Sequence, residues 1–538
     1  MPDGRGGPIA GPGRIVSLDF GGGDAAAVLA WLGVVAALWS GDLGAEPMAG
    51  PPALPSEPPR ADIFPLPREL PTDEFQPNVR HPYLYTTLET VLVLAGGTVW
   101  YLRHGTDESW RDAFDFRTWK RKLNGEDVTF DGDHFNTNAA GHPIDGAGYY
   151  QIARGNGLGP GAAFVTSALA STFWEFFVEL PEHPSINDLI MTPVGGAVIG
   201  EATYRLGRYL AVSGSGSVRC AAAFVFAPIA MINDRLHCGQ RDGILPAARL
   251  ELSVGLNRVE FDGGATRNEV ALAFGSDIVT QRAYRQAGSG GVMIGPGQWA
   301  GFNTDLRLGE SNLEGAWFNA RAVWGGRYQR HYRSMTEETD LPGTGGPTQG
   351  WGWLLGMGSS FDYRLRNLPT VHDRIASVGL LGPAFELSAR NGATMRATFN
   401  LQYAFALVGS IAYRADPTSL ADDVIKTELR NFGYYYAQGV VSSATLMFDL
   451  GAIGFNADGR GGWYWSINDG DPAQSAIQRD VRLHDTRFYL TTSVWTRPLV
   501  GAARFGLAYQ QVWRHSNMLG ATIATTENDI LATAALIF

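Results

Sequence analysis

The stretch Met395–Val408, MRATFNLQYAFALV, has the alternation that decides the fold. Large apolar residues such as Phe399 and Leu401 fall on one face of an extended chain, and polar residues such as Asn400 fall on the other. This period of two is typical of a β-strand whose two faces meet different surroundings. Similar segments of about 9 to 14 residues recur towards the C-terminus, and we expect roughly 12 of them to cross an outer membrane as tilted strands.

The last residues of the chain continue this pattern. Ile530, Ala532, Ala534 and Leu536 alternate with more polar residues, and the sequence stops on Phe538. A terminal aromatic strand resembles the insertion signal of bacterial outer-membrane barrels. We therefore predict a membrane β-barrel over residues 218–538, surrounded by outer-membrane lipid and inserted by the barrel-assembly machinery. A closed barrel satisfies every backbone group without leaving a free strand edge.

The same alternation also fits a soluble β-sandwich or barrel whose apolar face points inward. The number and length of the strands favour the membrane barrel over this alternative. An export signal also favours it, because Ala25–Trp39 is an uninterrupted apolar run that is too short to span a bilayer and is typical of a signal peptide. We expect a signal peptide over residues 1–45, cleaved after Ala45, and an extended proline-rich linker over 46–81.

Residues 82–212 have a helical pattern. Tyr83–Leu102 is long enough for a membrane helix, although a buried core helix fits it equally well. A second helix, about 161–180, carries Glu175 and Glu179 four residues apart, so both fall on one face and repel unless a cation or a shared proton lies between them.

A third helix is predicted from Pro184 onward, with Ser185 as N-cap three residues before Asp188. Glu201 and Arg205 are spaced to pair along it. The spacing of four also places Tyr150 and Arg154 on one face of a preceding helix.

The run from about 130 to 210 resembles a bacterial family of unknown function, domain-of-unknown-function family 3943. The resemblance depends on three groups of residues, which are Asn138 with His142-Pro143, Gly146 and Tyr150–Arg154; Trp174-Glu175 with Glu179; and Pro184-Ser185, Asn187–Leu189, Thr192, Gly195-Gly196 and Gly200-Glu201. It implies a bacterial envelope protein. It implies no established activity, so it supplies no catalytic residue.

Two interpretations of the polar residues in the helical region remain open. In the first, His142 acts with Glu175 or Glu179 as acid, base or metal ligand, and Arg154 clamps a lipid phosphate. In the second, Arg154 neutralises one of the two glutamates and the other polar side chains tie loops or cap helices. Buried ionisable groups are costly unless they are paired, so both interpretations bring these residues together. The candidate binding residues are Asn138, Tyr150, Arg154, Asn187, Asp188 and Glu201.

The amino-acid composition excludes several classes of protein and of binding site. A net charge of −11 and a pI near 5.4 argue against nucleic-acid binding, which rewards a basic surface. The two cysteines, Cys220 and Cys238, exclude a disulfide-rich scaffold and a cysteine-rich metal site, but they fit one disulfide as well as two unpaired thiols. No established metal or nucleotide motif occurs, and no cofactor is expected.

The predicted fold is therefore α+β, with an N-terminal helical module and a C-terminal outer-membrane barrel. We expect the module to lie at the periplasmic mouth of the barrel or inside its lumen, with its polar cluster facing the watery interior. Three functions follow from this arrangement. In the first, the module plugs or gates the barrel or supports envelope structure. In the second, the chain is an envelope enzyme that acts on lipid or lipid-linked substrates. In the third, the chain is a scaffold for envelope partner proteins.

Overall fold

The computed structural model describes most of the two predicted folded regions. The described residues are 79–104, 116–125, 128–179, 182–213, 217–236, 247–310, 312–335, 348–415, 427–467, 482–496, 503–518 and 521–537. The expected signal peptide, its cleavage site after Ala45, nearly all of the linker, Cys238 and Phe538 lie outside these residues, so the expectations about them stay predictions.

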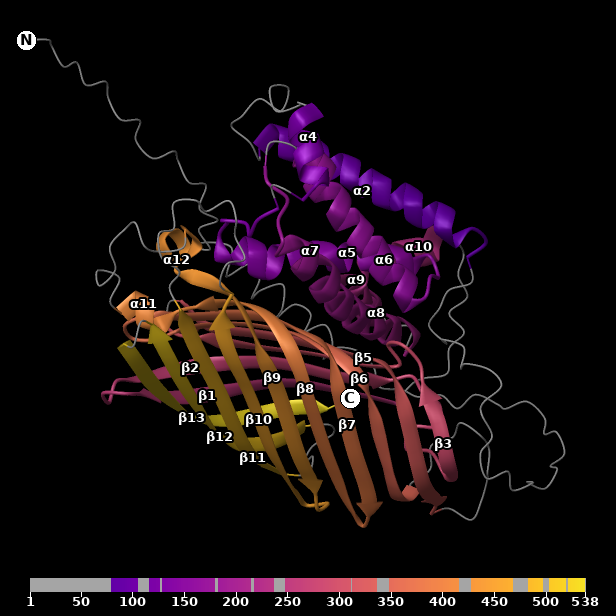
Figure 1. Ribbon diagram of the computed structural model, residues 1–538. Helices are drawn as coiled ribbons and strands as arrows, with labels where there is room; N and C mark the ends of the chain where they lie inside the picture. Colours follow the sequence, from indigo (N-terminus) through magenta and orange to yellow (C-terminus); the bar gives the residue numbers. More distant parts are fainter. Residues whose placement is uncertain are drawn as a thin grey trace, which may run out of the picture. The chain divides into compact units, whose positions relative to one another are not determined.

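The C-terminal region forms one antiparallel sheet of thirteen strands among the described residues (Figure 1). The strands are β1 (Ala247–Phe261), β2 (Thr266–Val279), β3 (Gly288–Ile294), β4 (Trp299–Leu308), β5 (Leu313–Ser334), β6 (Thr348–Asn367), β7 (His372–Asn391), β8 (Ala393–Gly409), β9 (Tyr434–Asp449), β10 (Ile453–Ser466), β11 (Leu483–Thr496), β12 (Ala503–Met518) and β13 (Ala521–Ile537).

Pairing between β5 and β6 closes this sheet into a barrel. From β6 to β13 each strand pairs with the next in sequence; β13 then pairs with β1, and β1, β2, β4 and β5 complete the ring. The short strand β3 pairs with the second half of β5, beyond the part that pairs with β4. The ring therefore has twelve strands, as predicted, and the α+β fold class is confirmed.

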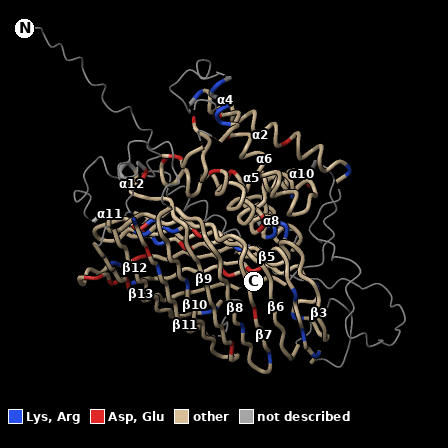
Figure 2. Tube along the Cα trace, viewed as in Figure 1, with Lys and Arg blue, Asp and Glu red and all other residues tan. Residues whose placement is uncertain are grey.

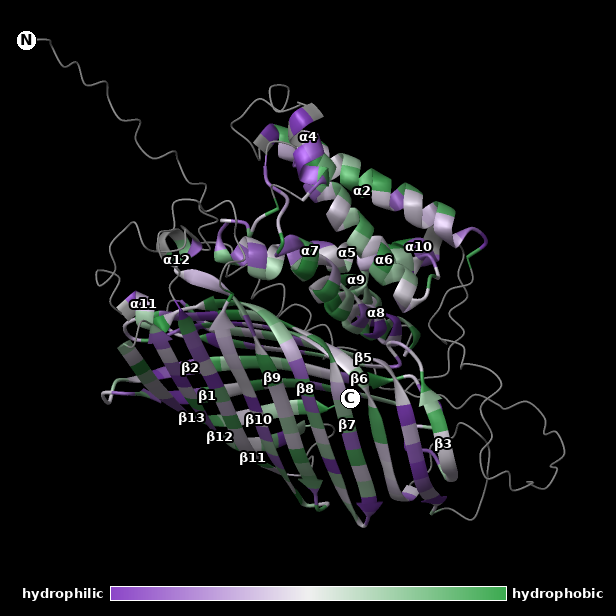
Figure 3. Ribbon diagram, in the orientation of Figure 1, coloured by the Kyte–Doolittle hydropathy of each residue, from purple (hydrophilic) through white to green (hydrophobic). Residues whose placement is uncertain are grey.

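The faces of the strands show which side of the barrel is apolar. On β8, Phe399, Leu401 and Tyr403 are exposed on the outside, whereas Arg396 and Gln402 line a cavity in the lumen. Apolar and polar bands alternate in the same way along the other strands (Figure 3). A soluble barrel would bury its apolar face, so the alternative with the apolar side inward is excluded and the fold is of the outer-membrane type.

Charged residues occur along the barrel strands (Figure 2), and several of their side chains pair with one another in the lumen. Asp373 of β7 accepts hydrogen bonds from Arg487 of β11 at 3.1 Å and from Arg514 of β12 at 2.6 Å. Arg514 also donates to Glu527 of β13 at 2.7 Å, and Glu527 accepts from Arg366 of β6 at 2.6 Å. Because each charge has an opposite neighbour, the interior holds ionisable groups that could not remain buried alone.

Two apolar clusters of buried residues also contribute to the barrel interior. In one, Tyr284 from the turn after β2 packs against Tyr328 of β5 and Leu354 of β6. In the other, Tyr413 of α11 (Ile411–Ala415) packs against Tyr435 of β9. A polar cavity of about 320 Å³ lies in the lumen. The described residues therefore fill much of the barrel interior with the protein's own side chains.

The helical module comprises the helices that precede the barrel. They are α2 (Pro82–His104), α4 (Phe116–Leu123), η1 (Thr137–Gly141), α5 (His142–Gly155), α6 (Pro160–Phe173), η2 (Trp174–Val178), α7 (Asp188–Ile190), η3 (Met191–Gly195), α8 (Gly196–Val212), α9 (Ser217–Phe226) and α10 (Pro228–Leu236); a further short helix, α12 (Thr427–Phe432), follows β8 and α11. By length and composition, the continuous helical segment Pro160–Val178 is the described helix that could cross a membrane.

The module extends further along the chain than predicted. Residues 217–236 form α9 and α10, and the first described strand begins at Ala247 instead of near residue 218. The run of small apolar residues around Cys220 has no clear period, and such a run cannot be distinguished from a strand by pattern alone. Cys220 therefore lies on helix α9 and not beside a first strand, and the choice between a disulfide with Cys238 and two unpaired thiols stays open because Cys238 lies outside the described residues.

The module packs against the outside of the barrel wall. On β6, Asp362 and Arg364 line the cavity in the lumen, and the alternating residues Phe361 and Tyr363 point the other way. These outward residues are buried in one apolar cluster with module residues, including Phe135 and Val198. Outward residues of β4, β7, β8 and β9 belong to the same cluster.

A second contact also places the module against the outer face of the barrel wall. Phe226 of α9 stacks on Phe274 of β2 at 5.7 Å between ring centres and meets Phe302 of β4 at 5.9 Å. Both strand residues alternate with residues that line the lumen. The expectation that the module lies inside the lumen is therefore wrong, and the expectation that it lies on the periplasmic side stays a prediction. The lumen is already occupied by paired charges, whereas the apolar helices match the apolar outer wall without desolvating ions.

Candidate functional site

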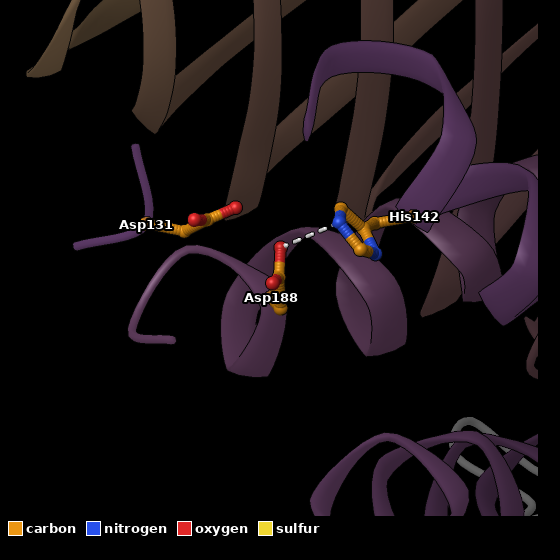
Figure 4. A group of neighbouring side chains, drawn as sticks. All are labelled: Asp131, His142 and Asp188. Carbon is orange, nitrogen blue, oxygen red and sulfur yellow. Dashed lines mark ion pairs between the residues drawn. The ribbon is translucent and has the colours of Figure 1, made fainter. Parts of the chain in front are cut away.

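Three side chains that can bind metal ions or protons converge where the module meets the outer wall. Asp131 precedes η1, His142 is the first residue of α5, and Asp188 is the first residue of α7. The Nε2 atom of His142 lies 3.2 Å from Oδ1 of Asp188. One ligand atom from each residue lies within 4.8 Å of the other two, with Asp188 between Asp131 and His142 (Figure 4).

A buried asparagine positions both aspartates. The Oδ1 atom of Asn187 accepts the backbone N–H of Asp131 at 2.9 Å, and its Nδ2 donates to Asp188 Oδ1 at 2.8 Å. The hydroxyl of Ser185 donates to Asn187 at 2.7 Å and accepts the backbone N–H of Asp188 at 3.4 Å. The helix begins at Asp188 with Asn187 at its N-cap position, later than the predicted start at Ser185, and the Asn187 side chain ties two segments together.

The barrel wall contributes the other side of the site. Tyr436 of β9 donates its hydroxyl to the backbone carbonyl of Asp131 at 2.8 Å. Asn138 is fully buried, and its Nδ2 donates to the hydroxyls of Tyr434 at 3.1 Å and Tyr436 at 2.8 Å. The side-chain oxygen of Asn138 has no hydrogen-bond partner among the described residues.

Burial controls the protonation of the cluster. Burial, together with the nearby carboxyls of Asp133 and Asp188, raises the pKa of Asp131 to about 8. Burial likewise raises the pKa of Asp188 to about 7, whereas it lowers the pKa of His142. Near neutral pH the cluster can therefore accept or release protons, which is the property required of acid–base groups.

The two glutamates lie beside this cluster, each with its own donor. Glu175 accepts the backbone N–H of Ser185 at 2.8 Å, and Glu179 accepts the indole N–H of Trp174 at 2.7 Å. Burial, together with the nearby carboxyl of Glu182, raises the pKa of Glu179 to about 8. The structure thus pairs His142 with Asp188, and the two glutamates are neighbours of that pair.

The remaining predicted residues form a separate buried cluster between α5 and α8. The Glu201 carboxylate accepts from Arg154 Nε at 2.9 Å, Arg205 Nε at 2.7 Å and the Tyr150 hydroxyl at 2.8 Å. The side chains of Arg154, Glu201 and Arg205 are fully buried. The pairing of Glu201 with Arg205 is confirmed. The expectation that Arg154 neutralises Glu175 or Glu179 is wrong, because Arg154 pairs with Glu201 instead.

Sequence reasoning missed Asp131. It lies in the irregular segment before η1, and its sequence neighbours place it in no motif. The pair Asp131 and Asp133, just before the asparagine-rich run at 136–138, is the signal that could have drawn attention to this segment. Its position beside Asp188 depends on the fold, because 57 residues separate the two.

Several solved barrels are similar to this chain at low identity. The translocator domain of the autotransporter NalP from Neisseria meningitidis is 9% identical, with 54% of this chain and 88% of that chain covered and a TM-score of 0.19. OpdO from Pseudomonas aeruginosa is 12% identical, with 54% and 97% covered and a TM-score of 0.14. The TodX monoaromatic hydrocarbon channel is 9% identical, with 54% and 89% covered and a TM-score of 0.19.

At these identities and TM-scores, the likeness says nothing about the role of this chain. Comparison with curated proteins gives no match. The model of one family does match, and it covers residues 127–229, which include Asp131, His142, Asp188 and the buried Arg154–Glu201–Arg205 cluster. The resemblance drawn from the sequence motifs is therefore confirmed, because this segment matches the domain of unknown function DUF3943.

Proposed function

We propose that the barrel anchors the helical module in the outer membrane and that the activity of the chain resides in the module, at its boundary with lipid. The observation that carries this proposal is the packing of the module on outward-facing residues of the wall, such as Phe361 and Tyr363. A pore with a gate would instead place the module in or over the lumen.

The outer surface of the module supports contact with lipid. Large apolar side chains on α2 and α6 are exposed, among them Leu92 and Leu169, the latter at 66%. Contiguous exposed apolar side chains are unusual on a soluble surface and typical of a surface that meets a membrane or a partner. The exposed apolar side chains of the barrel wall have the same character, so module and wall together fit one lipid-facing surface.

The contents of the lumen argue against a wide channel. Paired charges such as Arg396 with Glu386, at 2.7 Å, occupy the interior, and apolar clusters of buried residues also contribute to it. We therefore expect planar bilayers that contain the purified protein to show no large, stable conductance. A large conductance that persists in every preparation would contradict the anchor function.

Spin-label accessibility tests the position of the module. In a protein whose two cysteines are replaced by serine, a nitroxide is attached at Leu169→Cys on α6 or at Leu256→Cys, which is 71% exposed on β1. Oxygen concentrates in lipid and a nickel chelate stays in water, so both labels should collide with oxygen more often than with nickel. A label at Ser443→Cys, which lines the cavity in the lumen, is the control for a polar environment. Preference for nickel at residue 169 alone would show that the module stands in water.

A second candidate function is an envelope enzyme that acts on lipid or lipid-linked substrates. The pair of His142 with Asp188, beside the apolar wall, is the observation that favours it. Replacement His142→Ala should then alter the lipid profile of the envelope while leaving barrel folding intact. An unchanged profile with a folded protein would remove this candidate.

A further inference from the structure

The cluster of Asp131, His142 and Asp188 has features that an acid–base pair alone does not require. Two carboxylates and one imidazole come from three separate segments of the chain, and all three offer a ligand atom to the same small space (Figure 4). An acid–base pair needs His142 and one aspartate. The second aspartate adds like charge to a partly buried position, which is unfavourable unless a cation or a bound proton neutralises it.

We propose that Asp131, His142 and Asp188 bind a divalent transition-metal ion, with zinc as the ion that best fits the set. Neutral imidazole nitrogen and carboxylate oxygen are both zinc ligands, and carboxylate-only sites would favour magnesium or calcium instead. Two carboxylates and a neutral histidine carry two negative charges, which one divalent ion neutralises.

The distances fit such an ion. Ligand bonds of about 2.1 Å in a tetrahedron separate neighbouring ligand atoms by about 3.4 Å. The 3.2 Å between His142 Nε2 and Asp188 Oδ1 is close to this value. The ligand atom of Asp131 lies within 4.8 Å of the other two ligand atoms, so a small rotation of the Asp131 side chain would bring it to the same spacing. Three protein ligands leave one position open for water or for an oxygen of a substrate, which is the arrangement of catalytic zinc sites.

The surroundings hold the ligands in place. Asn187 donates to Asp188 and accepts from the backbone of Asp131, so one side chain orients two ligands. Outer contacts of this kind fix the direction of metal ligands and are a regular part of metal sites. Asn138 lies against Asp131, is fully buried, and keeps a side-chain oxygen without a hydrogen-bond partner among the described residues. This unpaired oxygen is an independent sign that a ligand, metal-bound water included, belongs nearby.

Zinc binding to the full chain tests the proposal. The purified protein in detergent is stripped with a chelator, dialysed, and titrated with Zn²⁺ alone by isothermal calorimetry, with metal content measured afterwards. We expect one Zn²⁺ per chain. His142→Ala and Asp188→Asn should each weaken binding by at least about 100-fold, because each removes a direct ligand.

Matched variants separate the site from unspecific binding. His134→Ala removes a histidine whose ring contacts Phe432 at 4.8 Å, and Asp145→Asn removes a carboxyl one turn along α5 from His142. Both controls should bind zinc as the parent does. Circular dichroism and a limited-proteolysis pattern identical to the parent establish that His142→Ala and Asp188→Asn are folded.

Two results would overturn the proposal. One is the absence of stoichiometric binding of Zn²⁺ to the stripped parent protein. The other is unchanged zinc affinity in folded His142→Ala or Asp188→Asn protein. Neither result bears on the position of the module, because the spin-label experiment needs no metal.

Discussion

Replacing Glu201 by glutamine should destabilise the module strongly while leaving the barrel intact. In the parent, Arg154 and Arg205 both donate to this carboxylate, at 2.9 and 2.7 Å, and all three side chains are fully buried. Glutamine keeps the shape and can still accept the Tyr150 hydroxyl, but it offers two buried guanidinium groups no negative charge. Removing one partner of a buried ion pair costs about 3–5 kcal/mol, which is a large part of the stability of a typical domain.

Hydrogen exchange measured by mass spectrometry can localise this loss. A loss of about 3–5 kcal/mol corresponds to a fall of about 10²- to 5 × 10³-fold in the protection of amides in α5 and α8. Amides of β8 should exchange as in the parent. Glu260→Gln, which removes an exposed carboxyl on β1, is the control and should change neither region.

Replacing all three charged residues by apolar residues of similar volume extends the experiment. Such a triple variant should recover much of the protection, because it removes the desolvated charges together with their pairing. Protection in Glu201→Gln within threefold of the parent would refute the reasoning, because the cluster would then contribute little to folding and a functional role would again be open.

Three further outcomes follow from particular contacts. Glu179→Gln should raise the thermal stability of the module at pH 8.5 but not at pH 4. Burial raises the pKa of Glu179 in the folded protein to about 8, so the contribution of the protonated carboxyl to stability is complete below about pH 4.5 and is lost as the pH rises towards 8. Equal shifts of the unfolding temperature at both pH values would contradict this. Gly146→Ala should destabilise the α5–η3 packing by about 1–3 kcal/mol in the same assay, because a Cβ would collide with the Thr192 carbonyl, whereas Gly148→Ala, with open space, should not. Leu401→Arg, 38% exposed in the middle of β8, should cost about 2–4 kcal/mol in barrel refolding into lipid, and Leu401→Ala much less.

Local patterns predicted the elements whose alternation continues along their length. Strand β8 spans Ala393–Gly409, close to the predicted Met395–Val408, because its outward side chains are apolar both where they are exposed and where the module covers them. The pairing of Glu201 with Arg205 was predictable for a related reason, since the two residues lie four positions apart.

The side of the wall on which the module lies could not be predicted. An outward apolar residue such as Phe361 looks the same in sequence whether lipid or a helix covers it. The cluster of Asp131 with Asp188 was equally hidden, since it depends on a tertiary contact across 57 residues. The helices at 217–236 were missed because their small apolar residues have no distinct period.

The tyrosines under the module explain why this part of the wall differs from the rest. Tyr363 donates to the side chain of Asn136 at 3.0 Å, Tyr434 to the carbonyl of Asp133 at 2.7 Å, and Tyr436 to that of Asp131 at 2.8 Å. Lipid tails offer no acceptor, so these outward hydroxyls would be unsatisfied on a bare wall. The barrel sequence is therefore adapted to the module, and the same hydroxyls that attach the module also hold the segment carrying Asp131. A loss of contact between module and wall would consequently disperse the candidate site, so the barrel wall is a structural part of that site.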